Sequence, residues 1–516
     1  MKTKKQLLIC FLILLFSRAG HSQPWYFNEI YNPNETWACG LSIIGSENGY
    51  FGCAISGDSV SDYFYNTSTF LLDESGEIVF WKDFGEYGYD YYPGDDGSLV
   101  KDEAGFGLFG SIVNLYNGVP KGIFYKFDQS GDTIFTRAFT SEIYNKVRGR
   151  TCSTSNNGGY ILAGDATEGQ NYSDIILIKL DSSGTEEWRN SYGTEMADWA
   201  KSVIQTFDQG YAVGCWTRIP SLLETADPTI IKTDSLGNFE WSLNLGGPYG
   251  DDKAMVSNTL DSCIMVLTAY ADSMYTPYHA YTRINLIKID PQGIVIWNKK
   301  YGASKPVNYI SNIQTTQNGG FILCGYSMIL DPSFANAGWI MEVNSAGDSL
   351  WYEDYYFYPP GSSDPFNELY DISITEDHGF IATGQAYTLF GSNQIQKMWV
   401  LKVDSVGCEI PNCWVGIEEE DKTVGREDDK KEGEDLVLWP NPARGIVDCR
   451  WSIVDGRGDM RLVIYDMFGR EIRKIATPEN EHEIQFSVED FRPGLYVIVL
   501  KDGNSTIGSA KMVIAR

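Results

Sequence analysis

The sequence predicts an all-β protein, a seven-bladed β-propeller followed by a small Ig-like β-sandwich. Three observations lead to this fold class. A turn motif recurs seven times at intervals of 53 to 60 residues, short alternating apolar runs flank each copy, and the chain holds 52 glycines with 14% aromatic residues. This composition suits short strands and turns better than long helices. A repeat of about four strands has the size of one propeller blade.

The recurring turn reads Asp/Asn-x-x-Gly. Its copies begin at Asp73, Asp128, Asp181, Asp234, Asp290, Asn344 and Asp404. The first side chain can accept hydrogen bonds from amides ahead of it, and glycine accepts the positive φ that such hairpins need. In six copies an aromatic residue follows the glycine by four or five positions: Trp81, Phe135, Trp188, Trp241, Trp297 and Trp351. We expect these rings to pack against the neighbouring unit as scaffold.

The strands around each turn follow from two apolar patterns. A run such as "DIILIKLD" precedes the turn, often with a lysine two positions before it, and a segment such as "GGYILAG" lies upstream. The seventh unit departs from this pattern, because Pro411 follows its turn. Residues 24–33, "PWYFNEIYNP", resemble the fourth-strand segments "WRNSYG" and "WNKKYG". We therefore predict that they supply the outermost strand of the seventh blade, which ties the chain ends together.

The ends of the chain define the remaining domains. Residues 1–22 have the form of a signal peptide, with three lysines before the ten-residue apolar run 7–16, which is too short to span a bilayer. No later stretch has eighteen apolar residues, so the mature protein is not expected to cross a membrane. The predicted domains are the propeller at 23–415, an acidic flexible linker at 416–435 and a C-terminal domain at 436–516.

Charge and cysteines limit the function classes. The formal net charge of −29 argues against nucleic-acid binding, which needs a basic surface. Cys408 and Cys413 are predicted to form a disulfide, which export permits. Cys53, Cys215 and Cys324 occupy equivalent repeat positions, so we expect them to be buried and small rather than paired. The four histidines are scattered and no C-x-x-C pair exists, so no structural metal site is predicted.

The C-terminal region carries four short motifs in order. They are "WPNPA" (439–443), "VIYDMFGREI" (463–472), "RPGLYVIVL" (492–500) and "KMVI" (511–514). The region resembles the C-terminal (type A) sorting domain of type IX secretion cargo, with Trp439 in place of the usual Tyr. The motif residues are Pro440, Asn441, Pro442, Asp466, Gly469, Arg470, Pro493, Gly494 and Tyr496. The resemblance implies recognition by the outer-membrane translocon, and release or attachment at the cell surface.

The repeat region resembles the repeat β-propellers of exported bacterial proteins of unassigned function. It is only distantly similar to the sialidase Asp-box, S-x-D-x-G-x-x-W, and to quinoprotein repeats. The form here is D-x-x-G-x-x-x-W. This mismatch counts against both of the enzyme classes that those repeats mark.

Candidate site residues come from the loops that enter the innermost strands and gather around the propeller axis. Six residues from these segments are predicted to line one mouth: Arg148, Arg150, Trp199, Asp252, Tyr309 and Glu368. The segment 89–97, "YDYYPGDDG", could hold calcium through its oxygen atoms, although an aromatic-rich loop is the favoured interpretation. No other cofactor is predicted.

These observations favour a secreted or cell-surface binding protein with an extracellular protein or glycan as ligand. A secreted propeller hydrolase acting on glycans is the alternative, and a structural surface component is a weaker third. A charged cluster at one mouth, with an arginine group or two carboxylates about 5 to 10 Å apart, would favour the hydrolase. A flat aromatic or acidic face would favour binding.

Overall fold

The computed structural model describes two compact units, residues 1–418 and 419–516. The residues described are 26–32, 37–57, 64–140, 146–167, 172–218, 226–247, 249, 253–276, 279–302, 307–329, 335–359, 362, 364–390, 395–409, 436–439, 446–451, 460–466, 471–477, 483–488, 490–491, 494–502 and 505–514. The predicted signal peptide and the whole of the predicted linker lie outside them. Because the two units are not placed relative to each other, each is described by itself.

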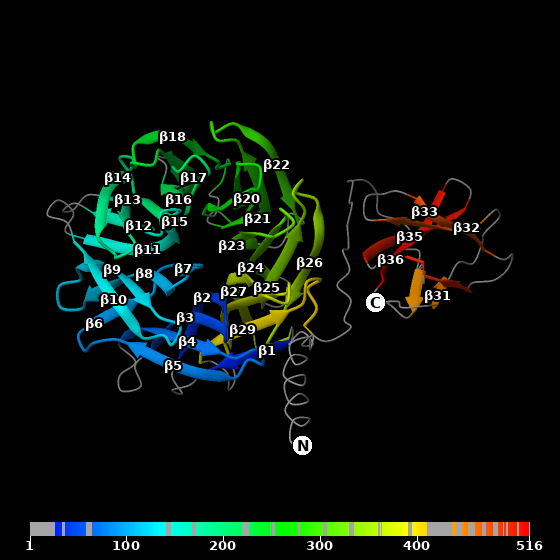
Figure 1. Cartoon of the computed structure of the whole chain (residues 1–516), viewed down its shortest axis with the longest axis horizontal. Helices are drawn as coiled ribbons and strands as arrows, with labels where there is room; N and C mark the ends of the chain where they lie inside the picture. The colour runs from blue at the N-terminus through cyan, green and yellow to red at the C-terminus, as the bar shows by residue number, and fades with distance from the viewer. Residues whose placement is uncertain are drawn as a thin grey trace, which may run out of the picture. The chain divides into compact units, whose positions relative to one another are not determined.

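The described part of the first unit forms seven antiparallel sheets, one for each predicted turn, arranged in a ring (Figure 1). We number them in chain order, each from its innermost strand outward. Sheet 1 contains β2 (Ala38–Ser46), β3 (Gly49–Gly57), β4 (Tyr65–Leu72) and β5 (Ile78–Phe84). Sheet 2 contains β6 (Tyr89–Tyr92) and β7 (Leu99–Asp102), which both pair with β8 (Gly105–Asn114), then β9 (Pro120–Phe127) and β10 (Thr133–Phe139). Sheet 3 contains β11 (Lys146–Thr154), β12 (Tyr160–Thr167), β13 (Ser173–Leu180) and β14 (Glu186–Tyr192).

The other four sheets follow the same order. Sheet 4 contains β15 (Asp198–Gln205), β16 (Tyr211–Arg218), β17 (Ala226–Thr233) and β18 (Phe239–Asn244). Sheet 5 contains β19 (Met255–Asn258), β20 (Ile264–Thr276), β21 (His279–Ile289) and β22 (Val295–Tyr301). Sheet 6 contains β23 (Val307–Thr315), β24 (Phe321–Ile329), β25 (Ala335–Val343) and β26 (Ser349–Tyr355). Sheet 7 contains β27 (Pro365–Ile374), β28 (Phe380–Thr388), β29 (Lys397–Val403) and, outermost, β1 (Phe27–Tyr31).

The ring is closed by its N-terminal strand. β1 pairs antiparallel with β29, and Phe27 lies opposite Lys402. The prediction that this segment supplies the outermost strand of the last sheet is therefore confirmed. The apolar core also runs around the whole ring. One buried apolar cluster fills each interface between successive sheets, including the interface of sheet 7 with sheet 1. An all-β propeller is the observed fold class.

The seven turns share one hydrogen-bond pattern. In each copy the Oδ1 atom of the first residue accepts from the backbone N–H groups two and four positions ahead, at 2.8 to 3.0 Å. The glycine has positive φ in every copy, for example +79° at Gly184. Asp and Asn serve equally well, since only a carbonyl-type oxygen is required. The predicted role of these residues in shaping the hairpin is confirmed.

An aromatic ring of each sheet covers the turn glycine of the next. A Cβ added to Gly184 would lie 2.4 Å from the Phe135 ring, and one added to Gly237 would lie 2.6 Å from Trp188. Phe27 covers Gly76 in the same way, so the closing strand also completes this ring of contacts. The expected packing on the neighbouring unit is confirmed.

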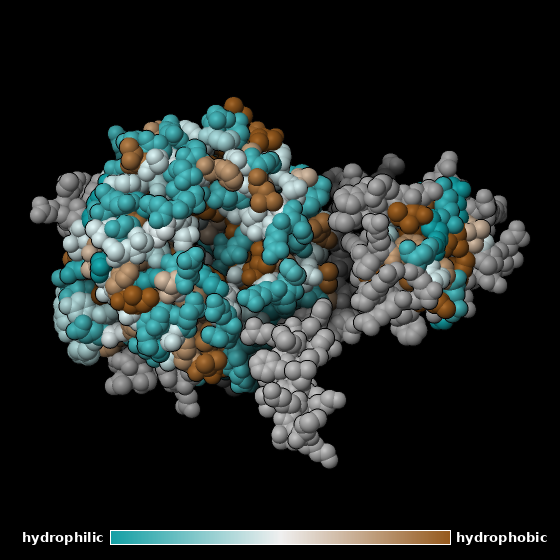
Figure 2. All heavy atoms as spheres, in the orientation of Figure 1, coloured by the Kyte–Doolittle hydropathy of each residue, from teal (hydrophilic) through white to brown (hydrophobic). Residues whose placement is uncertain are grey.

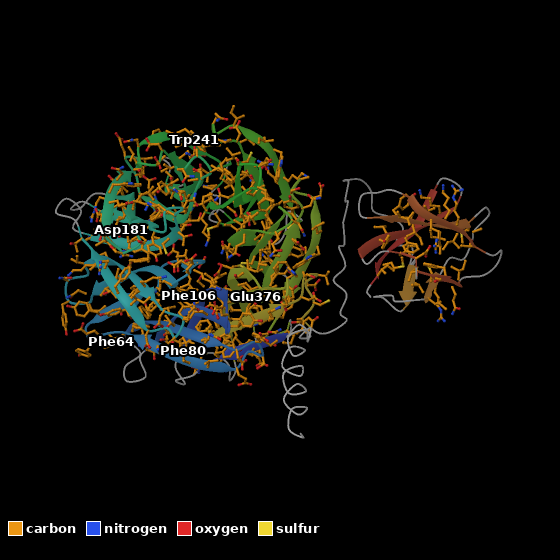
Figure 3. All side chains as sticks on the ribbon, in the orientation of Figure 1. Phe64, Phe80, Phe106, Asp181, Trp241 and Glu376 are labelled. Carbon is orange, nitrogen blue, oxygen red and sulfur yellow. The ribbon has the colours of Figure 1, made fainter. Side chains whose placement is uncertain are left out.

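In sheet 1 the residue predicted for this role is wrong. Phe80, not Trp81, covers the next turn glycine, Gly131, since a Cβ added to that glycine would lie 2.5 Å from the Phe80 ring. Trp81 instead stacks on Phe70, with ring centroids 5.6 Å apart. Adjacent residues of a strand point to opposite faces, so a shift of one position moves the ring to the other side of the sheet. Figure 3 labels Phe80 and Trp241, which lie on outermost strands of their sheets.

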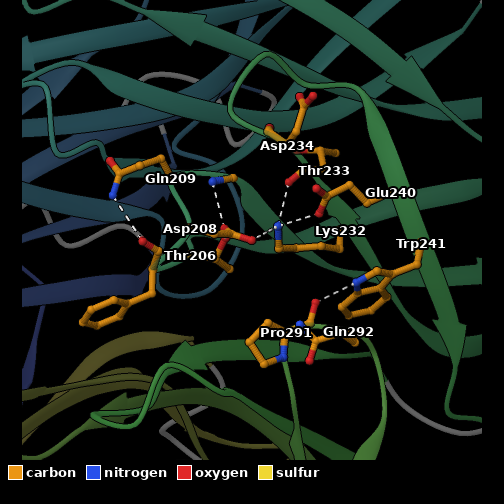
Figure 4. Close-up of polar contacts among 12 residues, drawn as sticks. Thr206, Asp208, Gln209, Lys232, Thr233, Asp234, Glu240, Trp241, Pro291 and Gln292 are labelled. Carbon is orange, nitrogen blue, oxygen red and sulfur yellow. Dashed lines mark hydrogen bonds and ion pairs between the residues drawn. The ribbon is translucent and has the colours of Figure 1, made fainter.

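The lysine two positions before the turn joins the two hairpins of a sheet. Lys232 is buried, and its ammonium group lies 2.8 Å from both Asp208 and Glu240 (Figure 4). Lys402 is likewise buried and binds Asp377 at 2.9 Å. Equivalent ion pairs involve Lys126 with Asp102 and Lys288 with Asp261. Charged side chains are therefore part of the scaffold in this molecule.

The cysteines agree with the pattern predicted from the repeat. Cys53, Cys215 and Cys324 are free and buried, as expected. Cys408 is disulfide-bonded, and its predicted partner Cys413 lies outside the described residues, so their pairing stays a prediction.

The second unit contains two sheets among its described residues. One has the order β30 (Leu436–Trp439), β31 (Ile446–Trp451), β34 (Glu483–Ser487), and the other β33 (Glu471–Ala476), β32 (Met460–Asp466), β35 (Gly494–Asp502), β36 (Ser505–Ile514). Side chains of both sheets share one core, for example Val447, Ile464 and Ile498. Two sheets around one core agree with the predicted sandwich, and the Ig-like topology stays a prediction.

Candidate binding face at the ring axis

The innermost strands all run in the same direction, since each is entered from the outermost strand of the preceding sheet. Their beginnings therefore gather at one face of the ring. The antiparallel second strands end at that face too. We call this face the mouth. In Figure 2 the face turned to the viewer carries mostly hydrophilic residues and is hollowed near its centre.

Five innermost strands carry a β-bulge at the same position. The register shifts between Gly40 and Ser42, Gly149 and Thr151, Ala200 and Ser202, Ile310 and Asn312, and Leu369 and Asp371. The extra residues are Leu41, Arg150, Lys201, Ser311 and Tyr370. A bulge turns its extra side chain out of the regular alternation. These positions hold a different residue type in each sheet, in contrast to the repeated turns.

Sheet 2 replaces the bulge with a loop that crosses the axis. This loop, residues 93–98 between β6 and β7, is called the axial loop. Its Asp95 N–H donates to the Arg150 carbonyl of sheet 3 at 2.7 Å, and its Gly97 N–H donates to the Leu41 carbonyl of sheet 1 at 3.0 Å. A Cβ on Gly97 would lie 2.6 Å from Asn312 Nδ2 of sheet 6, so only glycine fits there.

The carboxylates of the axial loop bind basic residues of sheets 3 and 4 and of the segment that enters sheet 5. Asp95 lies 2.9 Å from Arg150 Nη1 and 2.7 Å from Lys201 Nζ, and Asp96 binds Lys253 of the segment entering sheet 5. Arg150 also binds Asp165 of sheet 3 at 2.6 Å. We call these six residues, Asp95, Asp96, Arg150, Asp165, Lys201 and Lys253, the axial cluster. It contains three acids and three bases, so its charges balance.

Burial and ion pairing shift the pKa values of this cluster in different directions. Burial by itself would raise the pKa of Asp95, but Arg150 and Lys201 outweigh it and hold this pKa well below its usual value. For Asp165 burial is the stronger effect, and its pKa is raised despite Arg150. The pKa of Arg150 is raised by the two carboxylates, against the effect of its burial. Arg150 therefore stays charged and bridges both acids.

A second buried acid connects sheet 7 with its two neighbours. Asp371 is 1% exposed. Its Oδ2 accepts from Ser42 Oγ at 2.6 Å and from the Ile43 N–H at 2.8 Å, and its Oδ1 accepts from Asn312 Nδ2 and from the Ile372 N–H. Burial raises the pKa of Asp371 to about 6, although these donors act to lower it. This acid, like the axial cluster, binds sheets together.

The six predicted mouth residues have separate outcomes. Arg150 belongs to the axial cluster, and Arg148 is exposed on the same strand. Tyr309 and Glu368 are brought together through two further tyrosines. Tyr309 stacks on Tyr326 with centroids 4.7 Å apart, Tyr326 meets Tyr370 edge-on at 6.1 Å, and the Tyr370 hydroxyl donates to Glu368.

Trp199 lies with Trp216 of the adjacent strand, at 5.6 Å between centroids. Asp252 lies outside the described residues.

Glu368 is enclosed by donors. It is 7% exposed, and its carboxylate accepts from Asn336, Tyr370 and Gln385. The carboxylate therefore orients the Tyr370 hydroxyl and the two side-chain amides around it.

Half-buried aromatic pairs surround the mouth. Besides the pairs already described, Trp37 lies 5.3 Å from Tyr65, and Phe366 stacks on Tyr387 at 4.7 Å with an interplanar angle of 7°. Sequence reasoning considered only the innermost strand of each sheet. It therefore missed the aromatic partners that lie on the second or third strand. Strand pairing gives the signal that could have found them, because Trp199 and Trp216 lie opposite each other, as do Phe366 and Tyr387.

Sequence reasoning also missed four residues at the axis: Lys201, Lys253, Asp95 and Asp96. The alternation of apolar and polar residues along a strand does not show where a bulge or the axial loop occurs. Asp95 and Asp96, the adjacent carboxylates of the segment that could hold calcium, form ion pairs with Arg150 and Lys253. The described residues contain no group of three His, Cys, Asp or Glu side chains that could hold a metal ion. Calcium binding at this segment stays an untested prediction.

In the C-terminal unit the described motif residues lie on two central strands. Asp466 ends β32, and Gly494 and Tyr496 lie in β35. Tyr496 is buried against Phe491, with ring centroids 5.0 Å apart. Pro440, Asn441, Pro442, Gly469, Arg470 and Pro493 lie outside the described residues.

Comparison with known proteins addresses each unit separately. Residues 437–515 match the family model of the secretion system C-terminal sorting domain. The chain is similar in structure to the β-propeller domain of the Trilobed protease from Pyrococcus furiosus (8% identity, TM-score 0.39, covering 71% of this chain and 93% of that one). It is also similar to a protein of unknown function from Dyadobacter fermentans (9%, 0.41, 72% and 97%). A third is the GH93 α-L-arabinofuranosidase of Fusarium graminearum (12%, 0.41, 62% and 95%). No curated protein matches by sequence.

The fold and the matched domain define the class of this protein, a β-propeller protein that carries a type IX secretion sorting domain. It is an exported protein, secreted or attached at the outer cell surface. Within the part of the chain that the structure describes, no helix has the length and apolarity needed to span a membrane.

Proposed function

We propose that this protein is an exported binding module whose ligand-binding face is the mouth of the propeller. One observation carries the proposal. Aromatic pairs from sheets 1, 4, 6 and 7 are half-buried at the mouth, while the charged residues behind them bind one another. Concave sites lined with aromatic residues and a few placed polar groups are the usual form of a ligand site. The proposed ligand is an extracellular protein or a glycan.

The charged residues support binding over hydrolysis. A hydrolase of glycans needs one carboxyl group that can give up a proton to the substrate and another that can attack or activate water. Charges do converge at the axis here, as that alternative predicts. However, Asp95 and Asp96 bind cations, and Glu368 and Asp371 are buried among protein donors. The contacts of these four acids favour binding over hydrolysis. The aromatic pairs at the mouth favour binding over a purely structural role, which would not need them.

The C-terminal unit supplies delivery in this proposal. Its sorting motifs are proposed to be recognised by the type IX translocon. Deletion of residues 436–516 is expected to retain the protein inside the cell, measured by comparing cell and culture fractions. Normal export of the truncated protein would contradict this part of the proposal.

The binding function is tested with arrays of glycans and extracellular proteins, run with a broad glycosidase screen. The full-length protein is compared with a double variant, Tyr326→Ala with Phe366→Ala, which removes one ring from each of two mouth pairs. Phe207→Ala is the matched control, since Phe207 is 66% exposed in the turn between β15 and β16, at the face of the ring opposite the mouth. We expect array signals that the double variant loses and the control keeps. Signals insensitive to the mouth substitutions, or glycoside cleavage, would contradict the proposal.

A further inference from the structure

Three aromatic rings lie in a row where sheets 1 and 2 meet at the mouth. Trp37 lies 5.3 Å from Tyr65, and Tyr65 lies 5.5 Å from Tyr92, measured between ring centroids. Trp37 directly precedes β2 and Tyr65 begins β4, and both strands start at the mouth. Tyr92 belongs to β6, which pairs with the mouth end of β8. The three rings therefore come from two sheets and reach the same face of the ring.

Three further rings continue this row along the loops of the mouth. Phe64, next to Tyr65 in the chain, lies 5.0 Å from Tyr87, which stands in the loop between β5 and β6. Tyr116, in the turn between β8 and β9, rests on the backbone beside Tyr87, since a Cβ added to Gly88 would lie 2.8 Å from its ring. We call the six residues Trp37, Phe64, Tyr65, Tyr87, Tyr92 and Tyr116 the aromatic strip.

Backbone contacts and one buried acid hold the inner rings of the strip in place. Asp90 is 7% exposed, and its carboxylate accepts from the Tyr65 N–H at 3.1 Å and from the Tyr92 hydroxyl at 3.3 Å. The Trp37 carbonyl accepts from the Gly57 N–H at 3.0 Å. Rings that are already fixed lose little conformational freedom when a ligand binds.

The outer end of the strip is open to solvent. Tyr87 and Tyr116 are each 79% exposed, and the other four rings are half-buried. Among the described large apolar side chains that are exposed at this part of the mouth, Leu115 is the one aliphatic residue. A continuous exposed apolar patch on an exported protein marks a place where a partner or ligand binds. Here that patch is made of aromatic faces and phenol hydroxyls.

The charges beside the strip favour a neutral ligand. Burial and Asp90 raise the pKa of Tyr92, while Arg148 acts against them, so an acid and a base both lie near this hydroxyl. The exposed Arg148 disfavours a cation at this position. The formal net charge of −29 repels polyanions from the whole chain.

We propose that the aromatic strip binds a neutral, linear glycan. The face of an aromatic ring is electron-rich, so it attracts the weakly positive C–H groups on one face of a sugar ring. The tyrosine hydroxyls can donate to and accept from the sugar hydroxyls. A row of rings matches a polymer of repeated rings, whereas a bound peptide needs separate pockets for unlike side chains. This inference rests on the proposed binding function and specifies its ligand and its place at the mouth.

The test titrates the full-length protein by calorimetry with three neutral hexasaccharides, cellohexaose, xylohexaose and mannohexaose. The corresponding trisaccharides and hexagalacturonate are measured beside them. We expect at least one neutral hexasaccharide to bind, and to bind about tenfold or more tightly than its trisaccharide, because the longer chain covers more rings. Hexagalacturonate should bind more weakly than that hexasaccharide, since its charge is repelled.

The double variant Tyr87→Ala with Tyr116→Ala should bind the neutral hexasaccharide at least about tenfold more weakly. Tyr87→Phe with Tyr116→Phe keeps both ring faces and should retain most of the affinity. Phe207→Ala is the matched control, because this exposed ring lies at the opposite face and should not affect binding. Both tyrosines are exposed, so folding should be preserved, and thermal melting of every variant checks this.

The inference is overturned if no neutral hexasaccharide binds, if hexagalacturonate binds more tightly, or if hexasaccharide and trisaccharide bind equally. Unchanged affinity in the double alanine variant, or an equal loss in the double phenylalanine variant, would also overturn it. Capture of a proline-rich or other peptide at the mouth, lost in the Tyr326→Ala and Phe366→Ala double variant, would refute the glycan while the proposed function stands. If no ligand responds to any mouth substitution, the proposed function and this inference fail together.

Discussion

The Asp/Asn-x-x-Gly turns and the innermost strands of the same ring follow opposite rules. Every turn uses the same oxygen, the same two amides and the same glycine conformation. At the bulge of the innermost strands, the residue changes from Leu41 to Arg150 to Tyr370 as the ring is followed. Repetition marks contacts that every sheet needs in order to pack on the next. Variation marks contacts that depend on the axis, where all sheets meet at once.

The axis also shows how a repeat protein can become a single cooperative ring. In a linear array each repeat contacts only its neighbours. Here the axial loop of sheet 2 contacts sheets 1, 3 and 4 directly, as well as the segment that enters sheet 5. Loss of this loop's contacts should therefore affect the whole ring, whereas loss of one turn should affect one interface. Four predictions test this difference.

The largest effect is expected from Arg150→Met. This substitution leaves Asp95 and Asp165 without their shared cation in a largely buried site. Removing one partner of a buried ion pair costs about 3 to 5 kcal/mol. We expect a loss of this size in the free energy of unfolding, measured in urea, with one cooperative transition. A loss below about 1 kcal/mol would mean that the axial cluster does not hold the ring together.

The next effect concerns pH and Asp371. The pKa of Asp371 is about 6 in the folded protein, above the ordinary value of 3.8. The stability that its protonated form contributes is therefore fully present below pH 3.8 and is lost as pH rises through 6. A shift of this size corresponds to roughly 3 kcal/mol. Asp371→Asn should remove this share of the pH dependence, measured by urea unfolding at pH 4 and pH 7. The exposed-residue variant Glu47→Gln should keep the wild-type difference. An unchanged difference in Asp371→Asn would refute the assignment.

A turn glycine should cost less than the axial arginine. Gly184→Ala places a Cβ 2.4 Å from the Phe135 ring at φ +79°, so it adds a steric conflict to backbone strain. Gly118→Ala is the matched control, since Gly118 has φ +65° and nothing within 4 Å of the added atom. The control should lose about 1 kcal/mol from strain alone, and Gly184→Ala about 2 kcal/mol or more. Equal losses would show that the aromatic cover of the turn is unimportant.

The smallest effect should come from a turn acid, with the opposite pH sign from Asp371. Hydrogen bonds from Ser75 lower the pKa of Asp73, so its contribution is present above pH 3.8 and is lost as pH falls. Asp73→Asn keeps the accepting oxygen, as Asn344 does in its own turn. We expect the melting temperature of the variant to fall less between pH 5 and pH 3 than that of the wild type. A steeper fall in the variant would contradict this account of the turn.

Residue patterns predicted the contacts that repeat, and failed where a local irregularity changes the alternation. The turns, the buried cysteines and the closing strand around Phe27 were all predicted, because periodic spacing exposes them. At the mouth, Trp199 and Arg150 were predicted but Lys201 was not. Arg150 and Lys201 are both the extra residue of a bulge, and a bulge leaves no mark in the sequence that would show these two positions to be equivalent. The choice of Trp81 over Phe80 has a different cause: Phe80 follows the turn glycine by four positions, like the covering rings of the other sheets, but the tryptophan one position later was chosen.

The sequence by itself determined the repeat, the all-β class, the export domain and the residues of each turn, since these depend on local propensity and on spacing along the chain. Only the tertiary structure decided which charges meet. Asp96 and Lys253 are far apart in sequence, and they are brought together because seven sheets converge on one axis and sheet 2 sends a loop across it. Contacts of this kind depend on where the ring places each strand, and no local pattern of residues records that.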